Sequence, residues 1–293
     1  MLSLQKKGIN MNIRFIVDST FNLSSEIIEK YNISVVPLNV IINGESFRDG
    51  IDINFDEVLV ASENGKKVTT SQPAPGLFLT YYEKLKSEGA TDIICLTMSS
   101  TLSGTYQSAI LAKKEIEDIN IHVIDTLSTS IGAEMIMLLL LEEYEKGIDI
   151  DSFLKKAEEL RSNTTIMMSM RNLNALRRSG RLSRIKATLG NLLGVKAIIE
   201  YIKGKVFIET KSRTENGVID AIVKKMKDTL EYITGKIHIF VAHVGSPELL
   251  HKIEEKINAV FPKIKVELRN GITPVIAVNL GYGGFGIAWC YES

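Results

Sequence analysis

The sequence predicts an α/β protein of two domains: an α/β/α domain with a mainly parallel sheet, then an α/β domain with a mixed sheet. In the first half, apolar strand-like runs alternate with helical patterns, which is typical of parallel strands joined by crossover helices. In the second half, strand-like runs cluster, and two of them are separated only by the letters KGK. We place the boundary near residue 160, which divides the chain into residues 1–160 and 161–293.

The first half contains four expected strands, each a short apolar run bounded by polar or turn residues. Ligands of parallel sheets gather at the carboxyl ends of the strands, so binding residues are expected just after these runs. We expect strands at 13–18, 34–42, 92–98 and 119–125, and helices at 77–89, 103–118, 131–141 and 151–163.

The second half contains six expected strands and two long helices. A hairpin is predicted where Gly204 follows one strand-like run and precedes the next, because glycine adopts the positive φ that tight turns require. We expect strands at 165–170, 196–202, 205–211, 236–243, 264–268 and 273–278, and helices at 215–233 and 247–260.

The composition is that of a globular protein without a strongly charged partner. The chain has 293 residues, 45% of them hydrophobic, and a formal net charge of zero, so any electrostatic binding site must be local. Cys95 and Cys290 lie in apolar segments and are expected to be buried thiols rather than a disulfide. The start lacks an export signal, and the most apolar segment is too short to span a bilayer. We therefore expect a cytoplasmic protein without stable membrane insertion.

One segment, SSTLSGT at residues 99–105, concentrates hydroxyl side chains where a strand gives way to a helix. The first turn of a helix leaves backbone N–H groups unpaired and carries a partial positive charge. Ser103 is expected to cap this helix, and Gly104 to let a ligand approach the backbone. Hydroxyls and free amides suit a carboxylate or a phosphate. An ordinary capped helix beside a polar loop is the alternative, and the commoner case for one such segment alone.

A second hydroxyl-rich segment, TTSQPAPG at residues 69–76, also precedes a helix. It contains Thr70 and ends in two prolines, which are pre-organised for a first helical turn. Two such helix starts in one α/β domain could converge on one anion. The alternative is a capped helix behind a rigid turn.

No catalytic or metal-binding motif is recognised. The letters GYGGFG at 281–286 match a dinucleotide fingerprint, but too little chain follows for a βαβ unit. No nucleophile elbow or zinc-protease motif occurs, and the four histidines lack metal-ligand spacing. We expect no cofactor, no metal and no catalytic residue.

A basic run without a single acidic residue extends from Arg161 to Ile199. A solvated basic face is the ordinary explanation, and a phosphate-bearing or acidic partner is the alternative. Nucleic acid is not expected, because the run has no aromatic residue and no nucleic-acid module is recognised.

From about Ile13 to its end, the chain resembles the DegV family. The resemblance rests on VDSTFNLSSE, VVPLNVIINGESFRDGIDI, TTSQPAPGLF, SSTLSGTYQSA, RRSGRLS and ETKSRT, in this order. It implies a two-domain fold that binds one long-chain fatty acid in a tunnel between the domains. It further implies that the protein presents the carboxylate to a separate fatty acid kinase, which makes acyl phosphate for phospholipid synthesis, and that the carrier is not itself an enzyme.

The resemblance also implies site residues. Thr70 and a serine of the SSTLSGT segment, either Ser100 or the favoured Ser103, would hold the carboxylate beside Gly104. The family usually has a histidine near its C-terminal end that helps to hold the carboxylate, and this chain has Asn279 there. Asparagine donates an amide hydrogen bond but cannot become cationic, so head-group affinity, pH dependence and ligand class stay open.

Docking to the kinase is implied for exposed arginines. Arg213 matches a docking position of the family, and Arg178 and Arg181 are its expected neighbours. Two other functions stay open: an enzyme acting on another small carboxylated or phosphorylated ligand, with Ser103 or Thr70 as a catalytic group, and a regulatory protein with a basic docking face.

Overall fold

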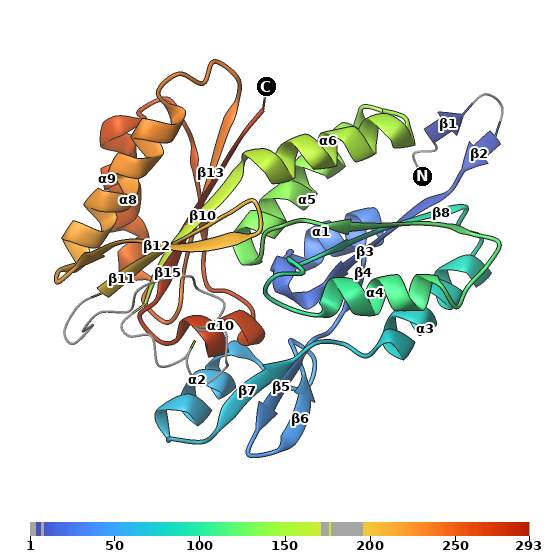
Figure 1. Ribbon diagram of the computed structural model, residues 1–293, viewed down its shortest axis with the longest axis horizontal. Helices are drawn as coiled ribbons and strands as arrows, with labels where there is room; N and C mark the ends of the chain where they lie inside the picture. The colour runs from blue at the N-terminus through green and yellow to red at the C-terminus, as the bar shows by residue number, and fades with distance from the viewer. Residues whose placement is uncertain (1–3, 7–8, 171–175, 177–195, 293) are drawn as a thin grey trace.

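A computed structural model describes residues 4–6, 9–170, 176 and 196–292 (Figure 1). Beyond a short hairpin of β1 (Leu4–Lys6) and β2 (Ile9–Met11), it contains a four-stranded parallel sheet, a three-stranded antiparallel sheet and a six-stranded mixed sheet. The predicted α/β class, with a parallel sheet followed by a mixed sheet, is confirmed. The boundary near residue 160 stays a prediction.

The parallel sheet has the strand order β4-β3-β8-β9 and is buried on both faces. On one face, apolar side chains pack against α3 and α4, and on the other face they pack against α5 and α6. All six residues of β8 are buried, as is typical of a central parallel strand. Its elements are β3 (Ile13–Asp18), η1 (Ser19–Phe21), α1 (Ser25–Tyr31), β4 (Ser34–Val36), α3 (Pro75–Ser87), β8 (Asp92–Thr97), α4 (Thr105–Lys113), β9 (Asn120–Asp125), α5 (Ser130–Glu145) and α6 (Ile150–Asn163).

The small antiparallel sheet was not expected as a separate unit. The apolar run at 34–42 is divided into two strands of different sheets, with Pro37 between them. Proline has no N–H group to donate to a ladder, so a continuous strand is interrupted there. The sheet has the order β6-β5-β7 and is formed by β5 (Asn39–Ile42), β6 (Glu45–Arg48) and β7 (Val68–Ser71), with α2 (Phe55–Glu63) beside it.

The mixed sheet has the order β12-β11-β10-β15-β13-β14, and only β13 and β14 are parallel. The predicted hairpin is confirmed, with Lys203 and Gly204 at φ of 50° and 70° in its turn. One face of the sheet packs against α8 and α9, and the other faces α5. Its elements are β10 (Thr164–Met170), β11 (Lys196–Ile202), β12 (Lys205–Ser212), α8 (Glu215–Leu230), β13 (Ile237–His243), α9 (Glu248–Val260), β14 (Val266–Arg269) and β15 (Phe285–Tyr291).

The strand expected at 273–278 is wrong, because this segment forms the helix α10 (Pro274–Leu280). Pro274 occupies the first helical turn, where its missing N–H group costs nothing. A short run that is apolar at almost every position has no periodicity by which a strand can be told from a helix. The strand β15, which the sequence analysis did not anticipate, follows and pairs with β10 and β13.

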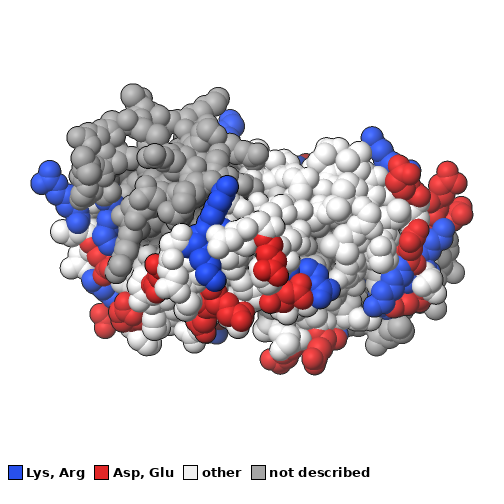
Figure 2. Space-filling model, turned by 90° about the horizontal axis from the view of Figure 1, so that it is seen from below, with Lys and Arg blue, Asp and Glu red and all other residues white. Residues whose placement is uncertain are grey.

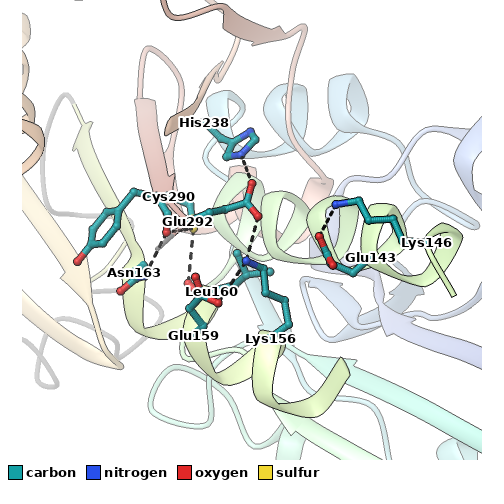
Figure 3. Close-up of polar contacts among 10 residues, drawn as sticks. Glu143, Lys146, Lys156, Glu159, Leu160, Asn163, His238, Cys290 and Glu292 are labelled. Atoms are coloured by element: carbon teal, nitrogen blue, oxygen red, sulfur yellow. Dashed lines mark hydrogen bonds and ion pairs between the residues drawn. The ribbon is translucent and has the colours of Figure 1, made fainter. Parts of the chain in front are cut away.

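Helix α6 docks against the end of β15 through polar contacts (Figure 3). The Glu292 carboxylate lies 2.9 Å from Lys156 Nζ and 3.0 Å from His238 Nε2. Asn163 donates a hydrogen bond to the carbonyl oxygen of Tyr291 at 3.1 Å. These contacts hold α6 against the mixed sheet, and the chain continues from α6 directly into β10.

Cys95 and Cys290 are buried and unpaired with each other, as the sequence analysis expected. Burial raises the pKa of both thiols to about 12. Within the part of the chain that is described, no helix has the length and apolar character needed to cross a membrane.

Candidate functional site

A cavity of about 130 Å³ lies where the parallel sheet, the small antiparallel sheet and the mixed sheet meet. It is predominantly apolar, and its described lining contains no Lys, Arg, His, Asp or Glu. The lining residues are Leu38, Thr70, Ser71, Met98, Leu102, Ser103, Thr129, Ser130, Ile131, Ile166, Met168, Met170, Leu176, Ile199, Tyr201, Val206, Ala242, Ile272, Val275, Ile276, Asn279, Leu280 and Gly286.

Part of the apolar wall comes from one face of the mixed sheet. Ile166, Met168 and Met170 alternate along β10, and all three line the cavity. Met167, between the first two, belongs to the cluster that packs against α8 and α9. Because side chains of a strand point alternately to opposite faces, one face of this sheet serves the hydrophobic core and the other serves the cavity.

Hydroxyl and amide groups from five elements or their ends form the polar part of the lining: β7, α4, α5, β11 and α10. Three residues predicted from the sequence, Thr70, Ser103 and Asn279, are brought together here. Thr129 and Ser130, at the start of α5, were missed, although their hydroxyl side chains follow a predicted parallel strand just as those of the SSTLSGT segment do. The Thr129 side chain is buried, and its hydroxyl has no hydrogen-bond partner among the described residues.

Ser100 is not a lining residue. It is exposed, and its backbone N–H group donates to Asp125 Oδ1 at 3.2 Å. The expected cap is wrong in its detail: Gly104, not Ser103, occupies the N-cap position of α4. Ser103 Oγ instead accepts from the N–H group of Thr105 at 3.3 Å and lies 2.9 Å from the Thr105 hydroxyl oxygen. It therefore still satisfies one free amide of the first turn while facing the cavity.

Gln72 explains how the two hydroxyl-rich segments meet. Its amide nitrogen donates to Ser108 Oγ on α4 at 3.3 Å. A Cβ atom at Gly104 would overlap the end of the Gln72 side chain, so a larger residue there would displace Gln72 from this position. The two hydroxyl-rich segments therefore meet through Gln72. Gly104 is not among the described lining residues, and its expected place beside a carboxylate stays a prediction.

Two buried carboxyl groups bond to the backbone of lining residues, and neither was expected from the sequence. Asp18, at the end of β3, accepts from the N–H group of Met98 at 2.6 Å. Asp49 accepts from the N–H group of Val275 at 3.0 Å and from the Ser19 hydroxyl at 2.6 Å. The signal for Asp18 was its place at the carboxyl end of a parallel strand, whereas Asp49 is positioned only by tertiary structure.

Burial raises the pKa of Asp18 and of Asp49 to about 6 in each case. Hydrogen bonds from Thr20 and Met98 lower the pKa of Asp18, but by less than burial raises it. Met98 and Val275 both line the cavity, so the two carboxyls hold the backbone of two lining segments.

The predicted docking arginines lie apart from the cavity lining or outside the described residues. Arg213 is exposed in the turn between β12 and α8. Arg178 and Arg181 lie outside the described residues, as does most of the basic run. On the face drawn in Figure 2, the described surface carries Lys and Arg side by side with Asp and Glu.

Comparison with known proteins identifies the family. A family model described as an uncharacterised protein of the DegV family matches residues 12–292. The chain belongs to the DegV family.

Relatives cover nearly the whole chain. A DegV domain-containing protein of Staphylococcus aureus (strain COL) is 35% identical over 272 residues, which is 93% of this chain and 96% of the relative. A second DegV domain-containing protein of that strain is 31% identical over 281 residues, which is 95% of this chain and 97% of the relative.

Solved structures of DegV family proteins confirm the DegV-like fold. The structure reported as fatty acid binding of a DegV family protein from Thermus thermophilus has a TM-score of 0.88 at 29% identity, and covers 96% of this chain and 100% of its own. The structure of DegV, a fatty acid binding protein from Bacillus subtilis, has a TM-score of 0.86 at 27% identity. The match covers 97% of this chain and 100% of the Bacillus subtilis chain.

Proposed function

We propose that this DegV family protein binds one long-chain fatty acid in the cavity between its sheets and presents the head group to a partner kinase. The observation that carries the proposal is the cavity itself, whose lining is predominantly apolar and whose described polar members are all hydroxyl or amide residues. Two DegV relatives of 29% and 27% identity are described as fatty acid binding, which supports the same ligand class.

The apolar wall suits the acyl tail, and burying the tail is the main source of affinity. Each buried CH₂ group contributes roughly 0.8 kcal/mol, so a chain of long-chain length gains far more from its tail than from its head. Thr70 and Ser103 both line the cavity, and in this proposal their hydroxyls hydrogen-bond the head group and fix the orientation of the lipid.

The surroundings of the hydroxyls favour a carrier over an enzyme. A catalytic serine or threonine requires a base within hydrogen-bond reach. The hydroxyl of Ser103 instead lies beside the Thr105 hydroxyl, and no histidine or carboxylate side chain is among the described cavity-lining residues. We therefore propose a carrier that acts in acyl phosphate formation, with the phosphoryl transfer performed by a separate fatty acid kinase.

Extraction and mass spectrometry of the purified protein test the binding function. We expect one fatty acid per chain after denaturation and organic extraction. In a Thr70→Val/Ser103→Ala variant, we expect affinity to fall by about tenfold or more, because each lost hydrogen bond to a charged or polar head is worth about 1 kcal/mol or more. A Thr80→Val/Ser87→Ala variant on α3 removes the same two hydroxyls outside the cavity lining and should bind as the wild type does. A protein that yields no lipid and takes up none would contradict the proposal.

The kinase partnership is tested at Arg213. Charge reversal to glutamate is expected to lower acyl phosphate formation with the fatty acid kinase of the same cell by about tenfold or more, since interface arginines are frequent hot spots. Fatty acid content should not change, because Arg213 is not a lining residue. Lys113→Glu, an equal change on exposed α4, is the control. Unchanged turnover and unchanged kinase binding in Arg213→Glu would exclude this residue from docking.

A further inference from the structure

We propose that the cavity holds its lipid by an uncharged, hydrogen-bonding head group, so that a bound fatty acid is present as the protonated acid rather than the carboxylate. This inference rests on the proposed lipid-binding function and specifies its ligand. It starts from the polar lining, whose described members are all neutral: Thr70, Ser71, Ser103, Thr129, Ser130, Tyr201 and Asn279. A carboxylate buried without a cation or several aimed donors is strongly disfavoured.

Asn279 has a buried acceptor with no hydrogen-bond partner among the described residues. Its Nδ2 atom donates to the carbonyl oxygen of Val275 at 2.9 Å. A carbonyl oxygen can only accept, so this bond fixes the orientation of the amide. The second N–H group of the amide remains a donor, and Oδ1 remains a buried acceptor. An O–H group of an acid or an alcohol can pair with this oxygen, whereas a carboxylate would repel it.

The charges behind the lining also disfavour an anion. Asp18 and Asp49 bond to the backbone N–H groups of the lining residues Met98 and Val275, at 2.6 and 3.0 Å. Burial raises the pKa of both carboxyls, and no cation is among the causes that act on either group. At neutral pH they place negative charge beside the backbone of two lining residues, Met98 and Val275.

The helix ends do not outweigh these charges. The N-termini of α4 and α5 lie at the cavity and each carry about half a positive elementary charge. The last turn of α10, which carries Asn279, offers the negative end of a helix dipole to the same region. The partial positive charges of the α4 and α5 N-termini are thus opposed by the Asp18 and Asp49 carboxyls and by the C-terminal end of α10. An uncharged lipid head group is not repelled by these negative charges.

Three lipids with the same sixteen-carbon chain test the inference: hexadecanoic acid, hexadecanol and hexadecyl sulfate, measured by competition below their micelle concentrations. In buffer at about pH 5, close to the pKa of a free carboxyl group, we expect the wild type to bind the acid and the alcohol within about tenfold of each other. The permanently charged sulfate should bind at least about 100-fold more weakly. A sulfate that binds as tightly as the acid would overturn the inference.

An Asn279→His variant provides the second arm. At about pH 6 a histidine side chain is largely protonated and supplies the missing cation. We expect hexadecyl sulfate to bind about tenfold or more tightly than it does to the wild type, with hexadecanol unchanged or weakened. No gain for the sulfate in a variant that melts like the wild type would overturn the inference. If none of the three lipids bound the wild type, the proposed function would fail as well, so the two failures are distinguishable.

Discussion

Replacing Gly286 with leucine is expected to lower the affinity for a full-length fatty acid by about 100-fold and to shift the bound lipid toward shorter chains. Gly286 lies on β15 and lines the cavity. A Cβ atom there would meet only Ile131 Cδ1 and the Met167 carbonyl oxygen, both at 3.8 Å, so the backbone accepts a side chain. The four carbons of leucine would displace about four methylene groups, worth roughly 3 kcal/mol of transfer free energy. Mass spectrometry of the extracted lipid measures the shift.

The neighbouring residue provides the control for this prediction. Ile287 is fully buried but belongs to the core cluster that packs against α8 and α9, on the opposite face of the same strand. Ile287→Val should cost about 1 kcal/mol of stability without changing the bound chain length. If a folded Gly286→Leu variant retained the wild-type lipid profile, the cavity would not be the site of the acyl tail.

Replacing Arg269 with methionine is expected to lower the free energy of unfolding by about 3–5 kcal/mol at pH 8, as is typical when one partner of a buried ion pair is removed. Glu134 on α5 is 3% exposed and accepts from Arg269 Nε at 2.5 Å. The guanidinium carbon also lies 4.2 Å from the centre of the Phe240 ring. Removing the cation leaves a buried carboxylate unpaired, and chemical denaturation measures the loss.

The loss should depend on pH in a definite direction. Burial raises the pKa of Glu134 from 4.5 to about 7, although Arg269 lowers it. A carboxyl with a raised pKa in the folded state destabilises the fold as pH rises from its unfolded pKa through its folded pKa. Without Arg269 the folded pKa rises further, so the variant should be close to the wild type at about pH 5 and weakest above pH 7.

Two further variants separate this cause from others. Adding Glu134→Gln to the Arg269→Met variant removes the unpaired charge and should restore most of the stability at pH 8. Lys265→Met removes a cation whose side chain is 82% exposed, and should change stability by less than about 1 kcal/mol. An Arg269→Met loss of equal size at pH 5 and pH 8 would show that lost packing on Phe240, and not the charge, is the cause.

Most of the fold was predictable because its elements have clear periodicity. The strands at 13–18 and 92–98, and the hairpin around Gly204, follow from apolar runs and turn chemistry alone. The segment 273–278 could not be assigned in this way, since its side chains are apolar on every side. It forms a buried helix that packs against α2, β5 and β7, and these contacts between distant segments are not contained in the local pattern.

The sequence by itself determined the two hydroxyl-rich segments, the neutral residue at position 279 and the lack of a recognised catalytic motif, because these depend only on residue type and spacing. Only the tertiary structure decided which hydroxyls face the cavity, and it separates Ser103 from the exposed Ser100. It also decided that Asp18 and Asp49 lie behind the lining. The physical reason is that a cavity and the charges around it arise from segments distant in the chain, whose meeting is set by packing rather than by local preference.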